Sequence, residues 1–115
     1  MPNNTIFHKI MRGEIPSTKV FEDEICFAIR DVNPVCPTHI LVIPKTDIPK
    51  LSETNKSHKE LLGHLLLVCS EIAKQENISE DGFRIVINSG ESAGQTVFQL
   101  HMHVLGGRDL SWPPG

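Results

Sequence analysis

Apolar and polar residues alternate without a break from Phe98 to Val104, inside the stretch Val97–Leu105. Side chains on a β-strand point to opposite faces in turn, so this pattern predicts a strand with one apolar and one polar face. The apolar face favours burial in a core, and the polar face sets its side chains in a row, roughly 6.5–7 Å apart. The apolar residues are Phe98, Leu100, Met102 and Val104, and the polar ones are Gln99, His101 and His103.

Shorter apolar runs predict the rest of a sheet. Val20–Phe21 and Cys26–Ile29 lie on either side of an acidic turn and predict a β-hairpin. Ile40–Pro44 is a continuous apolar and β-branched run, which is typical of a buried central strand. Phe83–Asn88 follows an Asp-Gly turn and predicts a further strand that ends beside a polar loop.

Two helices are expected, a short one near the N-terminus and a long one in the middle of the chain. Thr5 can cap the short helix over Phe7–Arg12, because its hydroxyl can accept a hydrogen bond from a free backbone N–H. The long helix is expected to begin at a capping box, with Ser57 at the cap and Glu60 at the third helical position. We expect it to extend to about Asn77.

The apolar positions of the long helix spread over an arc of roughly 160°, wider than the stripe of about 100° that covers one sheet face. A second apolar contact is therefore needed, and it predicts a homodimer. The positions in the arc are Leu61, Leu62, Leu65, Leu66, Val68, Cys69, Ile72 and Ala73.

Composition narrows the class of protein. The chain has 115 residues, the size of one domain, which we place at residues 1–115. Its formal net charge of −3 and its scattered cationic residues exclude a nucleic-acid polymer as a ligand. Residues 1–4 do not resemble a signal peptide, and no run reaches membrane length. Three unclustered cysteines favour a reducing compartment, so we expect a cytoplasmic protein without membrane contact.

The candidate chemistry lies on the polar face of the Val97–Leu105 strand. His101 and His103 follow the small polar loop of residues 90–96, and such a loop beside two imidazoles suits a phosphate. A single histidine on a strand is more often a surface residue. A His-x-His pair on a strand is also a common zinc-binding arrangement. No Cys-x-x-Cys, nearby third histidine or nearby carboxylate completes a zinc site, so we expect no metal or other cofactor.

The stretch from Gly94 to Leu105 resembles the histidine-triad motif, His-φ-His-φ-His-φ-φ, where φ is apolar. Gly106-Gly107-Arg108 and the ending Trp112-Pro113-Pro114-Gly115 are similar to the HINT branch of this superfamily, the histidine triad nucleotide-binding proteins. The resemblance covers nearly the whole chain. One departure is clear, because Gln99 stands at the position of the first histidine of the triad.

The resemblance implies an α+β fold, in which a five-stranded antiparallel sheet carries one long and one short helix. It also implies a homodimer whose two sheets join into a ten-stranded sheet. The implied activity is hydrolysis of the P–N bond of adenosine 5′-phosphoramidates, and of related AMP conjugates such as aminoacyl adenylates, through an adenylyl-His101 intermediate. His103 and Thr96 would steady the phosphate, and Gln99 completes the catalytic set.

By the same resemblance, the partner is a purine nucleoside monophosphate or phosphoramidate. His39 and Trp112 would support the site, and Asp47 stands where relatives often carry another histidine. A different class of function stays open, namely a nucleotide-binding module that Gln99 has deprived of turnover. The residues expected to bind the nucleotide are Phe7, Ile10, Ile15, Arg30, Asp31, Val32, Leu41, Asn88, Gly94, Gln95, Thr96, His101 and His103.

Overall fold

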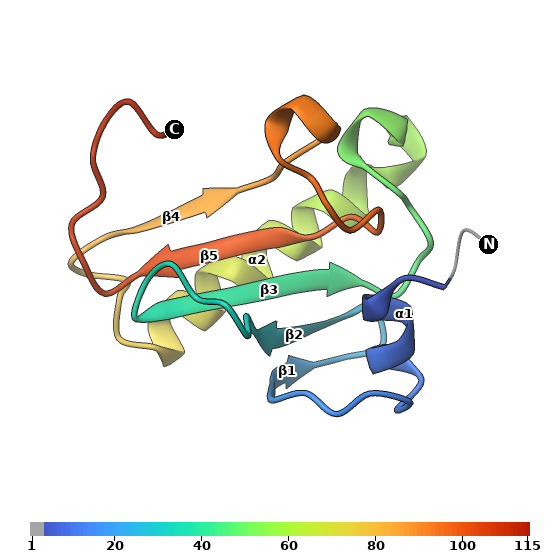
Figure 1. Cartoon of the computed structure of the whole chain (residues 1–115), viewed down its shortest axis with the longest axis horizontal. Coiled ribbons are helices and arrows are strands. Elements are labelled where there is room, and N and C mark those ends of the chain that lie inside the picture. Colours follow the sequence, from blue (N-terminus) through green and yellow to red (C-terminus); the bar gives the residue numbers. More distant parts are fainter. Residues whose placement is uncertain (1–3) are drawn as a thin grey trace.

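Five antiparallel strands form one sheet in the order β1-β2-β3-β5-β4 in the computed structural model of the chain, which describes residues 4–115 (Figure 1). This confirms the expected five-stranded antiparallel sheet. The long strand β3 lies at its centre, where every residue is buried, and β1 and β4 are the edges. The bounds are β1 Lys19–Glu22, β2 Cys26–Arg30, β3 Thr38–Pro44, β4 Phe83–Val86 and β5 Met102–Gly106.

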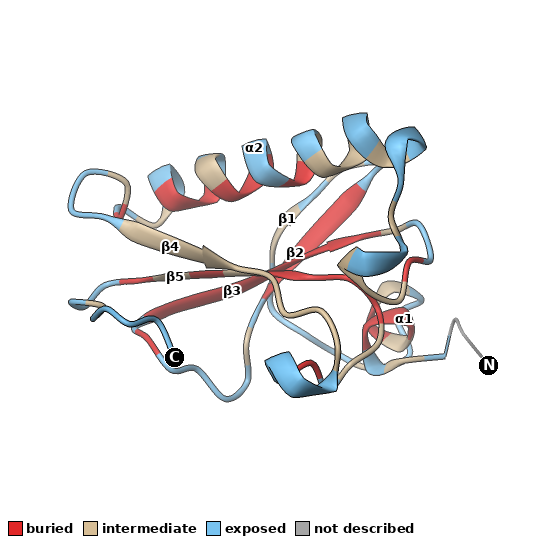
Figure 2. Ribbon diagram, turned by 90° about the horizontal axis from the view of Figure 1, so that it is seen from above, coloured by how far each residue is buried: buried red, intermediate tan, exposed pale blue. Residues whose placement is uncertain are grey.

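Two helices lie on opposite faces of the sheet (Figure 2). The long helix α2, Lys59–Gln75, covers one face, and the short helix α1, Ile6–Met11, lies on the other. The central strands are buried on both faces, because successive side chains alternate between two apolar clusters. In β3, for example, Ile40 and Val42 pack under α2, whereas Leu41 and Ile43 pack with α1. This two-sided burial explains the continuous apolar run of the sequence.

The strand expected over Val97–Leu105 begins only at Met102. Its partner β3 ends at Pro44, and Val42↔Met102 is the last pair of the β3–β5 ladder. The residues before Met102 bond instead to the loop after β3, where the N–H of Leu100 donates to the carbonyl of Ile48 at 2.7 Å. The strand expected over Phe83–Asn88 is also shorter and ends at Val86.

The helix boundaries differ by one or two residues from those expected, and the residues that cap the long helix also differ. Thr5 caps α1 as expected, with its hydroxyl accepting from the backbone N–H of His8. The capping box expected at Ser57 and Glu60 does not cap the long helix, whose N-cap, His58, makes no side-chain capping bond; a capping box of Asn55 and His58 instead begins the 3₁₀ turn before it. A short 3₁₀ turn precedes α2, and the Asn55 side chain accepts from the Ser57 N–H there at 2.9 Å. Asn55 reaches a free amide of the 3₁₀ turn, which begins before the helix proper.

The wide apolar arc of α2 is only partly covered within one chain. Its centre is buried against the sheet, but Leu66 is 48% exposed, and Leu67, beside the arc, is 70% exposed. Within residues 4–115, no helix is long and apolar enough to cross a membrane. Most of the N-terminal stretch that we compared with a signal peptide, residues 1–3, lies outside the described residues.

Candidate active site

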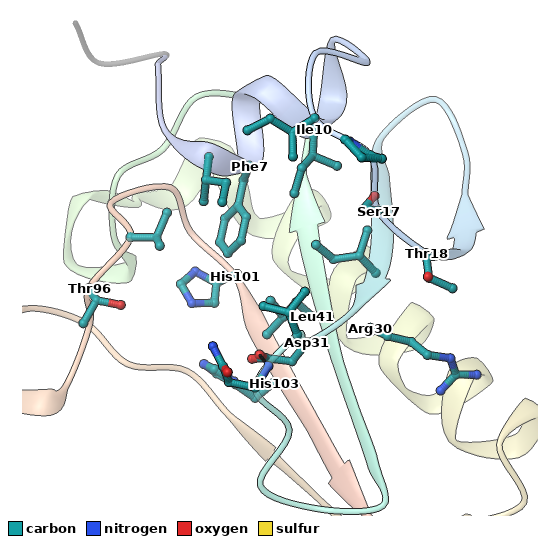
Figure 3. Close-up of a pocket in the computed structure, with 17 residues that line it drawn as sticks. Phe7, Ile10, Ser17, Thr18, Arg30, Asp31, Leu41, Thr96, His101 and His103 are labelled. Carbon is teal, nitrogen blue, oxygen red and sulfur yellow. Dashed lines mark hydrogen bonds between the residues drawn. The ribbon is translucent and has the colours of Figure 1, made fainter.

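A cavity of about 760 Å³ lies beside α1, on the face of the sheet opposite α2 (Figure 3). Helix α1 and the segment after it form one wall, and strands β2, β3 and β5 form the floor. The cavity brings together ten of the thirteen residues expected to bind a nucleotide. These are Phe7, Ile10, Ile15, Arg30, Asp31, Val32, Leu41, Thr96, His101 and His103.

One part of the cavity is apolar. Phe7 and Ile10 reach it from α1, and Leu41 reaches it from β3, where each side chain is less than a tenth exposed. The ring of Phe7 meets that of His101 edge-on, with centroids 4.9 Å apart (Figure 3). A flat aromatic ligand fits such a wall, because most ligand pockets are apolar with a few placed polar groups.

His101 is held in one tautomer by the backbone. Its Nδ1 lies 2.8 Å from the carbonyl oxygen of Gln99, which can only accept, so Nδ1 carries the proton. The lone pair of the neutral ring is therefore on Nε2. Burial lowers the pKa of His101 below its usual 6.5, although the bond to the Gln99 carbonyl partly offsets this. At neutral pH the ring is an uncharged base with a free Nε2 lone pair.

His103 is oriented by a second histidine. The backbone N–H of Val35 donates to Nδ1 of His39 at 3.1 Å, so His39 carries its proton on Nε2. That Nε2 lies 2.9 Å from Nδ1 of His103, which must accept, and the proton of His103 is left on its own Nε2. Burial, followed by the neighbouring His101 and His39, lowers the pKa of His103 to about 4. His103 therefore presents a neutral N–H donor, and its orientation is fixed by His39.

Asp31 stands at the end of β2, close to His103 (Figure 3). One carboxylate oxygen accepts from the backbone N–H of Asn33 at 2.8 Å, and the other lies 3.3 Å from Nε2 of His39. The carboxylate lines the cavity and retains further capacity as an acceptor. The side chain of its neighbour Arg30 points elsewhere, because both terminal guanidinium nitrogens donate to the Glu76 carboxylate at 2.9 Å. The charged end of Arg30 is thus directed towards the end of α2 and not towards a base.

Gln99 does not reach the cavity, although the alternation placed it in a row with the two histidines. Its side chain is buried in the loop that follows β3, where it makes three hydrogen bonds. The oxygen accepts from the N–H of Ile48 at 3.2 Å, and the nitrogen donates to the carbonyls of Pro44 and Thr46 at 3.0 and 2.8 Å. The row is broken because the regular strand starts only at Met102.

The polar loop contributes less than its composition indicated. Thr96 lines the cavity, but the backbone N–H groups of Gly94 and Gln95 donate within the loop, to Glu91 and Gly90. The Gln95 side chain also holds the loop, donating to the carbonyl of Pro49 at 2.8 Å. These two amides are therefore not free to bind a phosphate in this conformation.

Two more expected residues lie outside the cavity lining. Asn88 lies just after the end of β4 and does not line the cavity. Trp112 is 81% exposed and its ring lies 5.9 Å from the Arg84 guanidinium.

Seven residues of the lining were not expected. Most follow directly on α1 or stand next to an expected residue, and no local pattern marks them. Ser17, Thr18 and Asn33 are polar, but polar residues at these positions are typical of an ordinary loop. The seven are Ile6, Pro16, Ser17, Thr18, Ile29, Asn33 and Val97.

A metal fits this site poorly. Asp31, His39 and His103 could each offer a ligand atom, all within 4.8 Å of one another. Nε2 of His39 would have to lose its proton to bind a metal. The proton would then move to Nδ1, where the Val35 N–H already donates. The hydrogen bonds of His39 therefore disfavour a metal ion held by these three residues.

The sheet, the two helices and this histidine site are those of a histidine-triad protein. The HIT domain family profile matches residues 12–110, and the chain belongs to the HIT domain family.

Three relatives illustrate the similarity. A purine nucleoside phosphoramidase of Escherichia coli is 46% identical over 96% of this chain and 92% of its own length. A 14 kDa zinc-binding protein of Zea mays is 53% identical over 96% of this chain and 88% of its own. The crystal structure of a HIT family hydrolase from Legionella pneumophila superposes with a TM-score of 0.95 at 46% identity, covering 97% and 100% of the two chains.

Proposed function

We propose that this protein is a hydrolase that cleaves the P–N bond of adenosine 5′-phosphoramidates and related AMP conjugates, such as aminoacyl adenylates. The observation that carries the proposal is the pair of fixed tautomers, a free lone pair on Nε2 of His101 beside an N–H on Nε2 of His103. The two rings lie 5.1 Å apart, centroid to centroid. A nucleophile and a donor so close suit attack on a phosphorus atom.

In the first step, Nε2 of His101 attacks the α-phosphorus, and the P–N bond breaks as the N–P bond to His101 forms. The amine leaves with the bonding electron pair and takes a proton from water. His103 donates to a non-bridging oxygen, and Thr96 binds another. In the second step, water attacks the phosphorus as the N–P bond breaks and its electron pair returns to Nε2 of His101, and AMP departs. The attacking water gives its proton to the hydroxide left by the first step. Positioning and charge stabilisation account for most of such a reaction.

The rest of the cavity would bind the nucleoside. The Asp31 carboxylate would accept hydrogen bonds from the two ribose hydroxyls, because one carboxylate can accept two hydrogen bonds at once. Phe7, Ile10 and Leu41 would enclose the purine, and Val32, 88% exposed, lies at the open side. Ile15 completes this apolar wall. The Escherichia coli relative is named a purine nucleoside phosphoramidase, which supports a purine.

The protein would act as a homodimer. The edge strand β4 offers backbone groups to a second copy, and pairing two such edges would give the expected ten-stranded sheet. The exposed Leu66 and Leu67 of α2 would find the second apolar contact there. In such a dimer we expect Trp112 to reach the site of the partner. The three buried thiols, Cys26, Cys36 and Cys69, fit the expected cytoplasmic location.

The alternative is a nucleotide-binding module without turnover, and Gln99 is the observation that favours it. Steady-state release of AMP from an adenosine 5′-phosphoramidate with a chromogenic or fluorescent amine separates the two functions. The proposal expects turnover by the wild-type protein without added metal. Binding of AMP without release of the amine would establish the binding module instead.

A further inference from the structure

Helix α1, which carries Phe7 into the cavity, is tied to the rest of the protein by a buried histidine. His8 is only 1% exposed, and its Nε2 lies 2.7 Å from a carboxylate oxygen of Asp47. The backbone N–H of Thr5 donates to Nδ1 of His8 at 3.1 Å, so the proton of the neutral ring is on Nε2. Nε2 therefore donates to Asp47, across 39 residues of sequence.

The loop that carries Asp47 is in turn fixed by Gln99. The Gln99 side chain bonds to the carbonyl of Thr46 and to the N–H of Ile48, the two neighbours of Asp47. The backbone carbonyl of the same Gln99 accepts from Nδ1 of His101. One residue thus anchors both the ring of the proposed nucleophile and the loop that holds α1.

These contacts form a continuous chain that begins and ends at His101. His101 bonds to the Gln99 carbonyl, the Gln99 side chain bonds to the loop of Asp47, and Asp47 accepts from His8. The residue before His8, Phe7, packs its ring edge-on against that of His101, with centroids 4.9 Å apart. Since α1 has six residues, less than two turns, its position depends on contacts with the rest of the fold, which include the bond of His8 to Asp47 and the apolar packing of Phe7 and Ile10.

We propose that Asp47 is a positioning residue, which through His8 sets the place of Phe7 and so the orientation of the His101 imidazole. This inference rests on the proposed function for its kinetic consequence, but not for its structural one. The Asp47 side chain is 46% exposed, so water can take over as acceptor for His8 when the carboxylate is removed. The fold then survives, and what is lost is the link between the loop and α1.

The test compares Asp47→Ala with Asp47→Asn, which keeps an oxygen able to accept from His8. We expect kcat/KM for phosphoramidate hydrolysis to fall about tenfold in Asp47→Ala and less than about twofold in Asp47→Asn. Glu71→Ala, which removes an exposed carboxylate from the outer face of α2, is the control for charge and should match the wild type. Equal losses in Asp47→Ala and Asp47→Asn, or no loss in either, would overturn the proposal.

A double-mutant cycle with Phe7→Leu tests the route of the effect. If Asp47 acts through Phe7, adding Asp47→Ala to Phe7→Leu should lower kcat/KM by less than about twofold. Multiplying losses would show that Asp47 acts by another route.

Nuclear magnetic resonance of the His101 ring gives a readout independent of turnover. Its ¹⁵N and ¹H signals should shift and broaden in Asp47→Ala but not in Asp47→Asn or Glu71→Ala. Unchanged signals in Asp47→Ala would refute the positioning role. An inactive wild type with these signal changes would instead refute only the proposed function.

Discussion

The free energy of unfolding of the protein should depend strongly on the Gln99 side chain. Gln99→Ala deletes three buried hydrogen bonds, to Ile48, Pro44 and Thr46. At about 1 kcal/mol for each bond, the free energy of unfolding should fall by about 3 kcal/mol. For a chain of this size, that corresponds to a fall in Tm of about 12 °C. Gln75→Ala removes an exposed amide at the end of α2 and is the matched control, with Tm unchanged.

Gln99→His restores the histidine of the family motif and should be milder. A neutral imidazole has one donor and one acceptor, so it can keep at most two of the three bonds, and Tm should fall by about 4 °C. The backbone carbonyl of residue 99 accepts from Nδ1 of His101, and this hydrogen bond survives the change of side chain. We therefore expect hydrolysis by the wild type, and a change in rate of less than about a hundredfold, ~2.7 kcal/mol, in Gln99→His.

Two assays decide these expectations, thermal melting followed by circular dichroism and steady-state AMP release from one adenosine phosphoramidate. Melting of Gln99→Ala at the wild-type temperature would refute the structural role of the amide. An inert wild type that Gln99→His makes active would show that the protein is a binding module and that the lost histidine was required.

Three further predictions concern pH, the ribose and assembly. Because the native pKa of His103 is lowered to about 4, the unfolded chain binds more protons than the native state below about pH 6.5. The free energy of unfolding should therefore fall by about 1–2 kcal/mol from pH 7 to pH 5, a range that allows for partial exposure of the His103 ring. Urea titrations that show no fall in the free energy of unfolding would contradict this. Asp31→Asn should weaken AMP binding about tenfold in calorimetry but 2′-deoxy-AMP binding less, and equal losses would remove Asp31 from the ribose. Sedimentation at micromolar concentration should show a dimer that Leu66→Glu dissociates, whereas a wild-type monomer would argue against the apolar arc as an interface.

Local patterns in the sequence were sufficient to predict most of the individual helices and strands, whereas the five-stranded sheet was implied by the family resemblance. The apolar run of β3 follows from burial on two faces, which leaves a direct mark on the sequence. The start of β5 could not be predicted in this way. It depends on where the neighbouring β3 ends, at Pro44, and hydrogen bonds between distant segments leave no period in the sequence.

In the site, too, some residues could be predicted from the sequence and contacts between distant segments could not. His101, His103 and Asp31 were identified through their resemblance to a motif, and the fold places all three on one cavity. The buried bonds of Gln99 were not foreseen, because strict alternation placed its side chain beside His101. His8 had no signal of its own, since its partner Asp47 is 39 residues away.

If His101 is the nucleophile, its replacement by alanine should abolish hydrolysis while AMP binding survives. The measurement is AMP release from an adenosine phosphoramidate by the wild type and the variant, after calorimetry has shown that both still bind AMP. We expect a loss of more than about a thousandfold, ~4 kcal/mol of barrier, because the other imidazole of the described cavity lining, His103, has its unprotonated nitrogen occupied by the N–H of His39. A near-normal rate in His101→Ala would contradict it.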